Sequence, residues 1–149
     1  MRIIARVDGN HQAFILGGIK CTHLNQVEQI SFLVDTGCSV TCLLSDDVTR
    51  LRINWQPLSY APHSVRTANG TTIPRLLPDV DVYLPALDGF MRSTHKILHV
   101  HYPQMQILPP NPQLPNPQPT CYTCSLLGMD FLHRFRKWVF RDGFLTMDT

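Results

Sequence analysis

The sequence contains little glutamate, no long apolar run and no large excess of charge of either sign. Glu28 is the one glutamate among 149 residues, and this scarcity disfavours a helix-rich fold. No apolar run reaches the length of a membrane span, and residues 1–4 lack the apolar segment of a signal peptide. The net charge of +2 is too small to indicate binding to nucleic acid or to an acidic membrane. We therefore expect an intracellular (cytoplasmic) protein, unless the chain was cut from a longer precursor.

The composition is that of a single globular domain spanning residues 1–149. Hydrophobic residues make up 44% of the chain and charged residues 16%, which allows a sizeable core. Five cysteines, an odd number, fit a reducing compartment better than a disulfide framework. Cys121 and Cys124 have the spacing of metal ligands or of a redox pair. Because no second ligand pair with a matching spacing lies nearby, ordinary thiols are the favoured interpretation.

The most informative stretch is residues 30–41, in which an apolar run is followed by Asp35-Thr36-Gly37. The run at residues 30–34 predicts a buried strand. Burying a carboxylate at the end of such a strand costs free energy unless its charge is shared, hydrogen-bonded or neutralised. Gly37 permits a turn that a Cβ would hinder, and the hydroxyl of Thr36 can anchor the loop. The stretch indicates a catalytic carboxylate on a rigid loop, with an ordinary turn after a strand as the alternative.

Elsewhere the sequence predicts short strands and few helices. Ser45 is a plausible N-cap of a short helix that ends near Leu51, with Asp46 and Asp47 in its first turn. The expected strands cover residues 3–7, 12–19, 27–34, 80–84 and 95–101, and a final hairpin joins residues 137–140 to residues 144–147.

A further hairpin is expected where residues 64–67 and 71–73 flank Ala68-Asn69-Gly70. Asn-Gly between β-branched runs is the strongest short-range hairpin signal. Such hairpins also occur in any β protein, so the signal alone does not indicate a function.

Residues 102–120 hold seven of the twelve prolines. A segment so rich in proline cannot be a central strand or a helix, and we expect an extended loop. The loop is interpreted as a surface insertion, with a lid or a docking strip as the functional alternative.

Residues 126–132 form a second motif, in which an apolar strand ends at Gly128. The short helix that follows carries Phe131, Leu132 and Phe135 on one face.

The Asp35-Thr36-Gly37 loop, the hairpin at residues 68–70 and the segment at residues 127–130 resemble those of the retropepsins in identity and order. Retropepsins are the retroviral-type aspartic proteases, and similar chains include the DNA-damage-inducible relatives and single-domain prokaryotic homologues. The resemblance spans roughly residues 12–147 without the proline-rich loop. It implies a mainly β protein, a closed or partly open β-barrel with a flap hairpin and one short C-terminal helix, acting as a homodimer. The long proline-rich loop and Cys38, where alanine is commoner, depart from the family pattern.

The resemblance implies an aspartic endopeptidase with Asp35 as the catalytic residue. Peptide hydrolysis by this route needs two carboxylates that share a proton. Because the sequence has one Asp-Thr-Gly, a two-lobed enzyme is excluded, and Asp35 of each subunit must meet its copy at a two-fold axis. Thr36 would hold the two loops coplanar, and Gly37 would let the backbone approach the dyad. Mildly acidic pH would favour activity, and no metal or organic cofactor is required.

The same resemblance assigns roles to residues outside the loop. Ala68, Asn69 and Gly70 would form the flap that closes over an extended peptide or protein substrate, which would be cut between hydrophobic residues. Gly128 and Asp130 would be structural, and Asp130 would not belong to the catalytic dyad.

Two other classes of function remain open on the sequence. The first is a catalytically weak dimer of the same fold that binds peptides or serves assembly. The second is a small zinc or redox module that uses Cys121 and Cys124.

Overall fold

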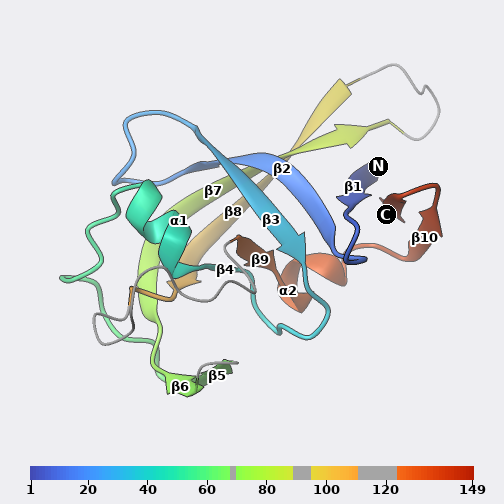
Figure 1. The fold of residues 1–149 in the computed structure, drawn as a ribbon. Helices are drawn as coiled ribbons and strands as arrows, with labels where there is room; N and C mark the ends of the chain where they lie inside the picture. Colours follow the sequence, from blue (N-terminus) through green and yellow to red (C-terminus); the bar gives the residue numbers. More distant parts are fainter. Residues whose placement is uncertain (68–69, 89–94, 111–123) are drawn as a thin grey trace.

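The computed structural model describes residues 1–67, 70–88, 95–110 and 124–149, which form a mainly β protein (Figure 1). Its helices in these ranges are short, α1 (Ser45–Arg50) and α2 (Met129–Leu132). Among the described residues, no helix has the length and apolarity that crossing a bilayer requires. The strands are β1 (Arg2–Val7), β2 (Ala13–Lys20), β3 (Glu28–Val34), β4 (Cys42–Leu43), β5 (Val65–Thr67), β6 (Gly70–Thr72), β7 (Arg75–Leu87), β8 (His95–Ile107), β9 (Ser125–Leu127), β10 (Lys137–Arg141) and β11 (Phe144–Asp148).

Most of the described strands close into a barrel. Nine of them share one sheet in the order β10-β11-β1-β2-β3-β9-β4-β8-β7. Because β7 also pairs with β1 and β2, the sheet closes on itself. The pair β5–β6 forms a separate two-stranded sheet, which lies apart from the barrel in Figure 1. The predicted mainly β barrel is therefore confirmed.

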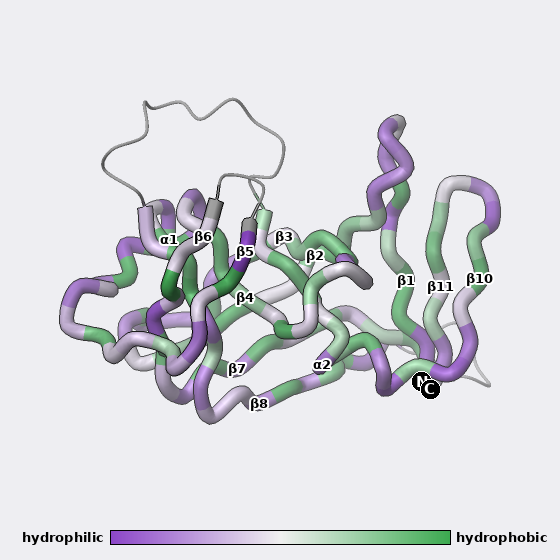
Figure 2. The backbone as a smooth tube through the Cα atoms, turned by 90° about the horizontal axis from the view of Figure 1, so that it is seen from below, coloured by the Kyte–Doolittle hydropathy of each residue, from purple (hydrophilic) through white to green (hydrophobic). Residues whose placement is uncertain are grey.

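Alternate side chains of the strands fill the barrel interior, as the two-residue period of a strand requires. Ile3 and Ala5 of β1 are fully buried, whereas Ile4 between them is exposed. Phe32 of β3 and Phe131 of α2 are among the largest fully buried side chains. Figure 2 shows the matching hydrophobic stretches along β1 and β3. Close packing in this core holds β3 rigidly, and the residue after β3 opens the predicted catalytic loop.

The prediction of an extended loop over residues 102–120 is wrong at its start. Strand β8 continues to Ile107 and pairs with β7 throughout. The ladder pairs the residues on both sides of Asp79 and Pro103 but skips these two, and Asp79 has a φ of 50°. Proline lacks the N–H that a regular ladder uses, so an interruption in the ladder accommodates it within a strand. The greater part of the proline-rich segment, residues 111–120, lies outside the described residues.

The helix after β4 begins where expected, but its cap differs. Leu44 is the N-cap, with extended backbone and no side-chain hydrogen bond, so Ser45 is the first helical residue. The Ser45 carbonyl accepts a hydrogen bond from the Thr49 hydroxyl at 2.8 Å. The prediction of Ser45 as the N-cap is therefore wrong. Asp46 and Asp47 do lie in the first turn, where the helix dipole favours negative charge.

The two ends of the chain lie side by side (Figure 1). The predicted final hairpin is present, with β10 and β11 joined by Asp142 and Gly143, which have φ values of 52° and 79°. Strand β11 then pairs with β1. Arg2 forms an ion pair with Asp148 at 2.7 Å, and this guanidinium holds the pKa of the Asp148 carboxyl below its usual value.

Candidate active site

Asp35 occupies the first position after β3 and is held by the neighbouring strand β9. The N–H of Asp35 donates to the Leu127 carbonyl at 3.1 Å. The Asp35 carboxylate is partly exposed, and its Oδ1 accepts the N–H of Gly37 at 2.8 Å. A Cβ on Gly37 would lie 3.2 Å from that oxygen. Glycine is therefore favoured at position 37 by this close approach and not by a left-handed backbone conformation. Thr36, between them, is exposed.

The start of α2 supports the loop from the other side. The N–H of Met129 donates to the Cys38 carbonyl at 2.8 Å, and the N–H of Asp130 donates to the Ser39 carbonyl at 3.1 Å. A Cβ on Gly128 would lie 2.3 Å from the carbonyl carbon of Val40, which is far inside contact distance. Glycine at position 128 therefore lets two backbone segments meet, and this contact fixes the loop.

Thr41 is the centre of a hydrogen-bond network between the loop and α2. Its hydroxyl donates to Asp130 Oδ1 at 2.8 Å and accepts the N–H of Gly128 at 3.1 Å, while its own N–H donates to the same carboxylate oxygen at 2.8 Å. The Tyr102 hydroxyl donates to the Thr41 hydroxyl at 3.3 Å, and burial raises the pKa of Tyr102 to about 12. Thr41 is only 2% exposed. The sequence analysis assigned Tyr102 to a loop and therefore missed it.

Cys38 lies in the same loop, and Cys42 is the first residue of β4, where it is buried. The Cys38 Sγ donates to the Val40 carbonyl at 3.0 Å. Interaction between the two thiols lowers the pKa of Cys38 to about 7 and, together with burial, raises the pKa of Cys42.

The strands expected on either side of residues 68–70 are present as the antiparallel pair of β5 and β6, and their role as a flap stays a prediction. Gly70 opens β6 and pairs with Thr67 of β5. Ala68 and Asn69, the other two predicted flap residues, lie outside the described residues.

Arg75 clamps the segment that leads into this hairpin. Its guanidinium lies 3.6 Å over the Tyr60 ring and 5.8 Å from the centre of the Trp55 ring, and it donates to the Leu58 carbonyl at 2.6 Å. Planar guanidinium groups suit such stacking. The sequence analysis missed Arg75, because a single arginine at the start of a strand carries no local signal.

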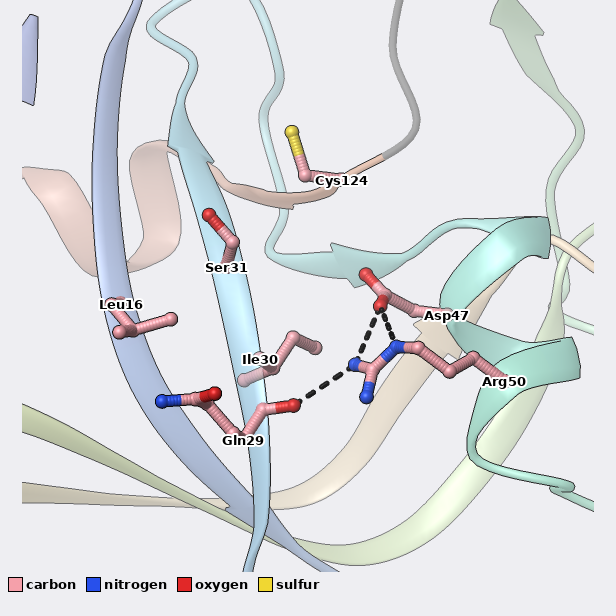
Figure 3. Close-up of a pocket in the computed structure, with 7 residues that line it drawn as sticks. All are labelled: Leu16, Gln29, Ile30, Ser31, Asp47, Arg50 and Cys124. Atoms are coloured by element: carbon pink, nitrogen blue, oxygen red, sulfur yellow. Dashed lines mark hydrogen bonds and ion pairs between the residues drawn. The ribbon is translucent and has the colours of Figure 1, made fainter.

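A second carboxylate, that of Asp47, lines a pocket of about 290 Å³ (Figure 3). Both of its oxygens accept hydrogen bonds. Its Oδ2 accepts the N–H and the hydroxyl of Ser125 at 3.1 and 2.7 Å, and its Oδ1 accepts from Arg50 at 2.8 Å. Arg50 also donates to the Gln29 carbonyl at 2.9 Å. Asp47 is 6% exposed and ties α1 to β9. Such a carboxylate is a structural link and has no free oxygen for acid–base chemistry.

In the described part of the chain, no group of three histidine, cysteine or acidic side chains is arranged to hold a metal ion. Cys124 is partly buried, and burial raises the pKa of its thiol. Cys121, its partner in the alternative zinc or redox module, lies outside the described residues.

Comparisons with known proteins agree with this architecture. Residues 19–131 match the model of a family described as aspartyl protease. The fold is similar to that in the crystal structure of a retropepsin-like aspartic protease from Rickettsia conorii, with a TM-score of 0.57. That alignment has 22% sequence identity and covers 99% of this chain and 89% of the other, and at this identity it supports the fold alone. No curated protein matches the chain.

Proposed function

This chain belongs to the aspartyl protease family, and on that premise we propose that it is an endopeptidase whose active site forms between two copies of the chain. The observation that carries the proposal is the partly exposed Asp35 on a loop that β9 and α2 hold in place. The chain has one Asp-Thr-Gly, and its Asp47 and Asp130 carboxylates are occupied by hydrogen bonds within the protomer. The second catalytic carboxylate therefore comes from Asp35 of a second copy.

The two carboxylates divide the acid–base work. One Asp35 carboxylate takes a proton from a water molecule, which attacks the carbonyl carbon of the peptide bond, while the protonated Asp35 of the other copy donates to the carbonyl oxygen. Proton transfer to the leaving nitrogen then accompanies cleavage of the C–N bond. Two adjacent like charges do not ionise together, so the pair titrates as a unit and mildly acidic pH favours the active form.

The residues around Asp35 keep the carboxylates in position. The Gly37 N–H orients Asp35 Oδ1 and stabilises its negative charge. Thr36 is exposed beside Asp35. We assign to Thr36 the contact between the Asp35 loop of one copy and that of the other.

The substrate is a peptide or protein chain in extended conformation. The β5–β6 pair forms a two-stranded sheet separate from the barrel sheet, which suits it to close over such a chain by strand addition. Cleavage between hydrophobic residues is the expected specificity. The chemistry requires no metal or organic cofactor.

The decisive experiment compares wild type with Asp35→Asn on a mixed peptide library from acidic to neutral pH. We expect cleavage by the wild type that is lost in Asp35→Asn and retained in Asp46→Asn, because Asp46 is exposed and lies on α1. Equal mixing of wild type with Asp35→Asn would lower the wild-type activity to about half, because random pairing puts half of the wild-type chains with an inactive partner. An undiminished rate on mixing would refute the shared site. A folded dimer that binds peptides without cutting them would indicate a binding module instead.

A further inference from the structure

The pocket beside Asp47 presents polar groups that the proposed hydrolysis does not use. It lies between β3 and α1, and residues 29–31 of β3 and Leu16 of β2 line it together with Arg50 of α1 (Figure 3). Ser31 precedes Asp35 by four positions of extended chain, a separation of roughly 13 Å. The pocket is therefore separate from the Asp35 loop.

Arg50 keeps two hydrogen-bond donors unused in this pocket. Its Nε and Nη2 donate to Asp47 Oδ1 at 3.2 and 2.8 Å, and Nη2 also donates to the Gln29 carbonyl at 2.9 Å. A guanidinium carries five N–H groups, so the two of Nη1 remain, without a partner among the residues that the structure describes. The Arg50 side chain is 49% exposed, which leaves these donors accessible to a ligand.

The negative charge of Asp47 does not cancel this capacity. Asp47 also accepts the N–H and the hydroxyl of Ser125 at 3.1 and 2.7 Å, so four hydrogen bonds engage its two oxygens. The pocket thus offers an incoming group free donors and no free charged acceptor. Such a site suits a carboxylate, because a charge-assisted hydrogen bond to a guanidinium is stronger than one between neutral groups.

One edge of β3 adds a backbone donor. Strand β9 pairs with β3 from Phe32 to Val34, and along residues 28–31 this edge has no partner among the described strands. The Asp35 N–H faces β9, where it donates to Leu127, and the backbone groups of a strand alternate between its two edges. The N–H of Ser31, four positions earlier, therefore faces the same edge. A backbone N–H beside a guanidinium can capture the carboxylate at the end of a peptide chain.

An exposed apolar side chain borders the same pocket. Leu16 is 56% exposed and pairs with Ser31 in the β2–β3 ladder, so the two side chains lie on one face of the sheet. Contact with an apolar ligand group would remove Leu16 surface from water, which is favourable. A ligand that fits the pocket therefore combines a carboxylate with an adjacent apolar group.

We propose that this pocket binds a carboxylate that lies next to an apolar side chain, as at the C-terminus of a polypeptide that ends in a hydrophobic residue. The carboxylate accepts from Arg50 Nη1 and from the Ser31 N–H, and the apolar side chain packs on Leu16. A free N-acylated amino acid has the same chemistry. Cleavage between hydrophobic residues would release chains with this terminus, so the pocket would hold product, and this link alone rests on the proposed function.

The test follows the amide signals of the full wild-type chain by NMR during addition of acetyl-Gly-Gly-Leu, either as the free acid or as the C-terminal amide. We expect the free acid to shift the Gln29 and Ser31 signals and the amide to bind about tenfold more weakly, because the charge-assisted bond is lost. N-acetyl-leucine distinguishes the two sources of the carboxylate. Tighter binding of the tripeptide assigns the pocket to polypeptide C-termini, and equal binding assigns it to small acids; either result supports the carboxylate site. The readout requires no cleavage, so failure of the proposed function leaves it intact.

Three variants test the position of the ligand. Leu16→Glu should weaken binding of the free acid about fivefold or more, because its carboxylate repels that of the ligand. Leu16→Gln has a similar size without the charge and should weaken binding less. Val27→Glu places the same charge at a position that is 52% exposed and outside the pocket lining, and it should leave binding unchanged.

Three results with the wild type would overturn the proposal. The first is equal binding of the free acid and the amide. The second is the absence of shifts at Gln29 and Ser31, whether or not signals near Asp35 move. The third is displacement of the tripeptide by an equal concentration of inorganic phosphate, which would show that the pocket does not select an apolar carboxylate. All three can be read in the wild type alone, so the test does not depend on whether the variants fold.

Discussion

Replacement of Thr41 by valine tests whether the network between the loop and α2 holds the candidate site together. Thr41→Val keeps the shape of a side chain that is 2% exposed and removes its hydroxyl. That hydroxyl donates to Asp130, accepts from the Gly128 N–H and accepts from the Tyr102 hydroxyl. One substitution therefore breaks three hydrogen bonds without opening a large cavity.

The expected loss follows from the partners of the Thr41 hydroxyl. A hydrogen bond to a charged group such as the Asp130 carboxylate contributes about 1.5–3 kcal/mol. The buried N–H of Gly128 is left without this acceptor, at a cost of about 1–3 kcal/mol. The additional methyl group returns about 1 kcal/mol. We expect a net decrease of about 3 kcal/mol in the free energy of unfolding, which lowers the ratio of folded to unfolded protein by about two orders of magnitude.

Thr49→Val is a matched control for this measurement. The Thr49 hydroxyl also donates one hydrogen bond, to the Ser45 carbonyl at 2.8 Å, but it is exposed to solvent. Water can replace this bond, so we expect a change below about 1 kcal/mol. Urea unfolding at one fixed protein concentration should show a lower midpoint for Thr41→Val at an unchanged slope. Equal midpoints for the two variants would refute the central role of Thr41.

Three further predictions concern the same supports. Gly128→Ala should destabilise the protein by about 2 kcal/mol or more in urea unfolding, because its Cβ meets backbone, whereas Gly9→Ala, with nothing within 4 Å, should be neutral. Asp47→Ala should lower the free energy of unfolding by about 3 kcal/mol and the exposed Asp46→Ala by under 1 kcal/mol; equal losses would contradict a structural Asp47. Between pH 10 and 12 the unfolded chain ionises at Tyr102 before the folded protein does, so the wild type should lose stability there more steeply than Tyr102→Phe, as urea midpoints measured against pH would show.

The local parts of the fold could be predicted from the sequence. Alternation of apolar residues predicted most strands, and the apolar run before Asp35 predicted β3 with an end that agrees. Asn69-Gly70 predicted a hairpin, and β5 and β6 are paired there. Such features depend on neighbours in the chain, which the sequence displays directly.

Features that depend on distant segments could not be predicted in this way. Pro103 argued for a loop, yet it fits within β8 because the ladder is interrupted opposite it at Asp79. The sequence placed Asp47 in the first turn of a helix, where it would interact with the helix dipole, but its main partner is Ser125, 78 residues away. A sequence pattern carries no information about a partner that only the folded chain brings near.

The hydrogen bonds that hold the Asp35 loop lie within one protomer, and this bears on how the proposed dimer would work. The described bonds that hold Asp35 and Thr41 come from β9, α2 and β8 of the same chain. A protomer therefore brings a formed loop to its partner, and dimerisation supplies mainly the second carboxylate. On this reasoning, weakening the contact between protomers lowers activity only on dilution. Loosening the loop, as in Thr41→Val, lowers the rate even at protein concentrations that keep every protomer paired, because the carboxylate itself is then less well positioned.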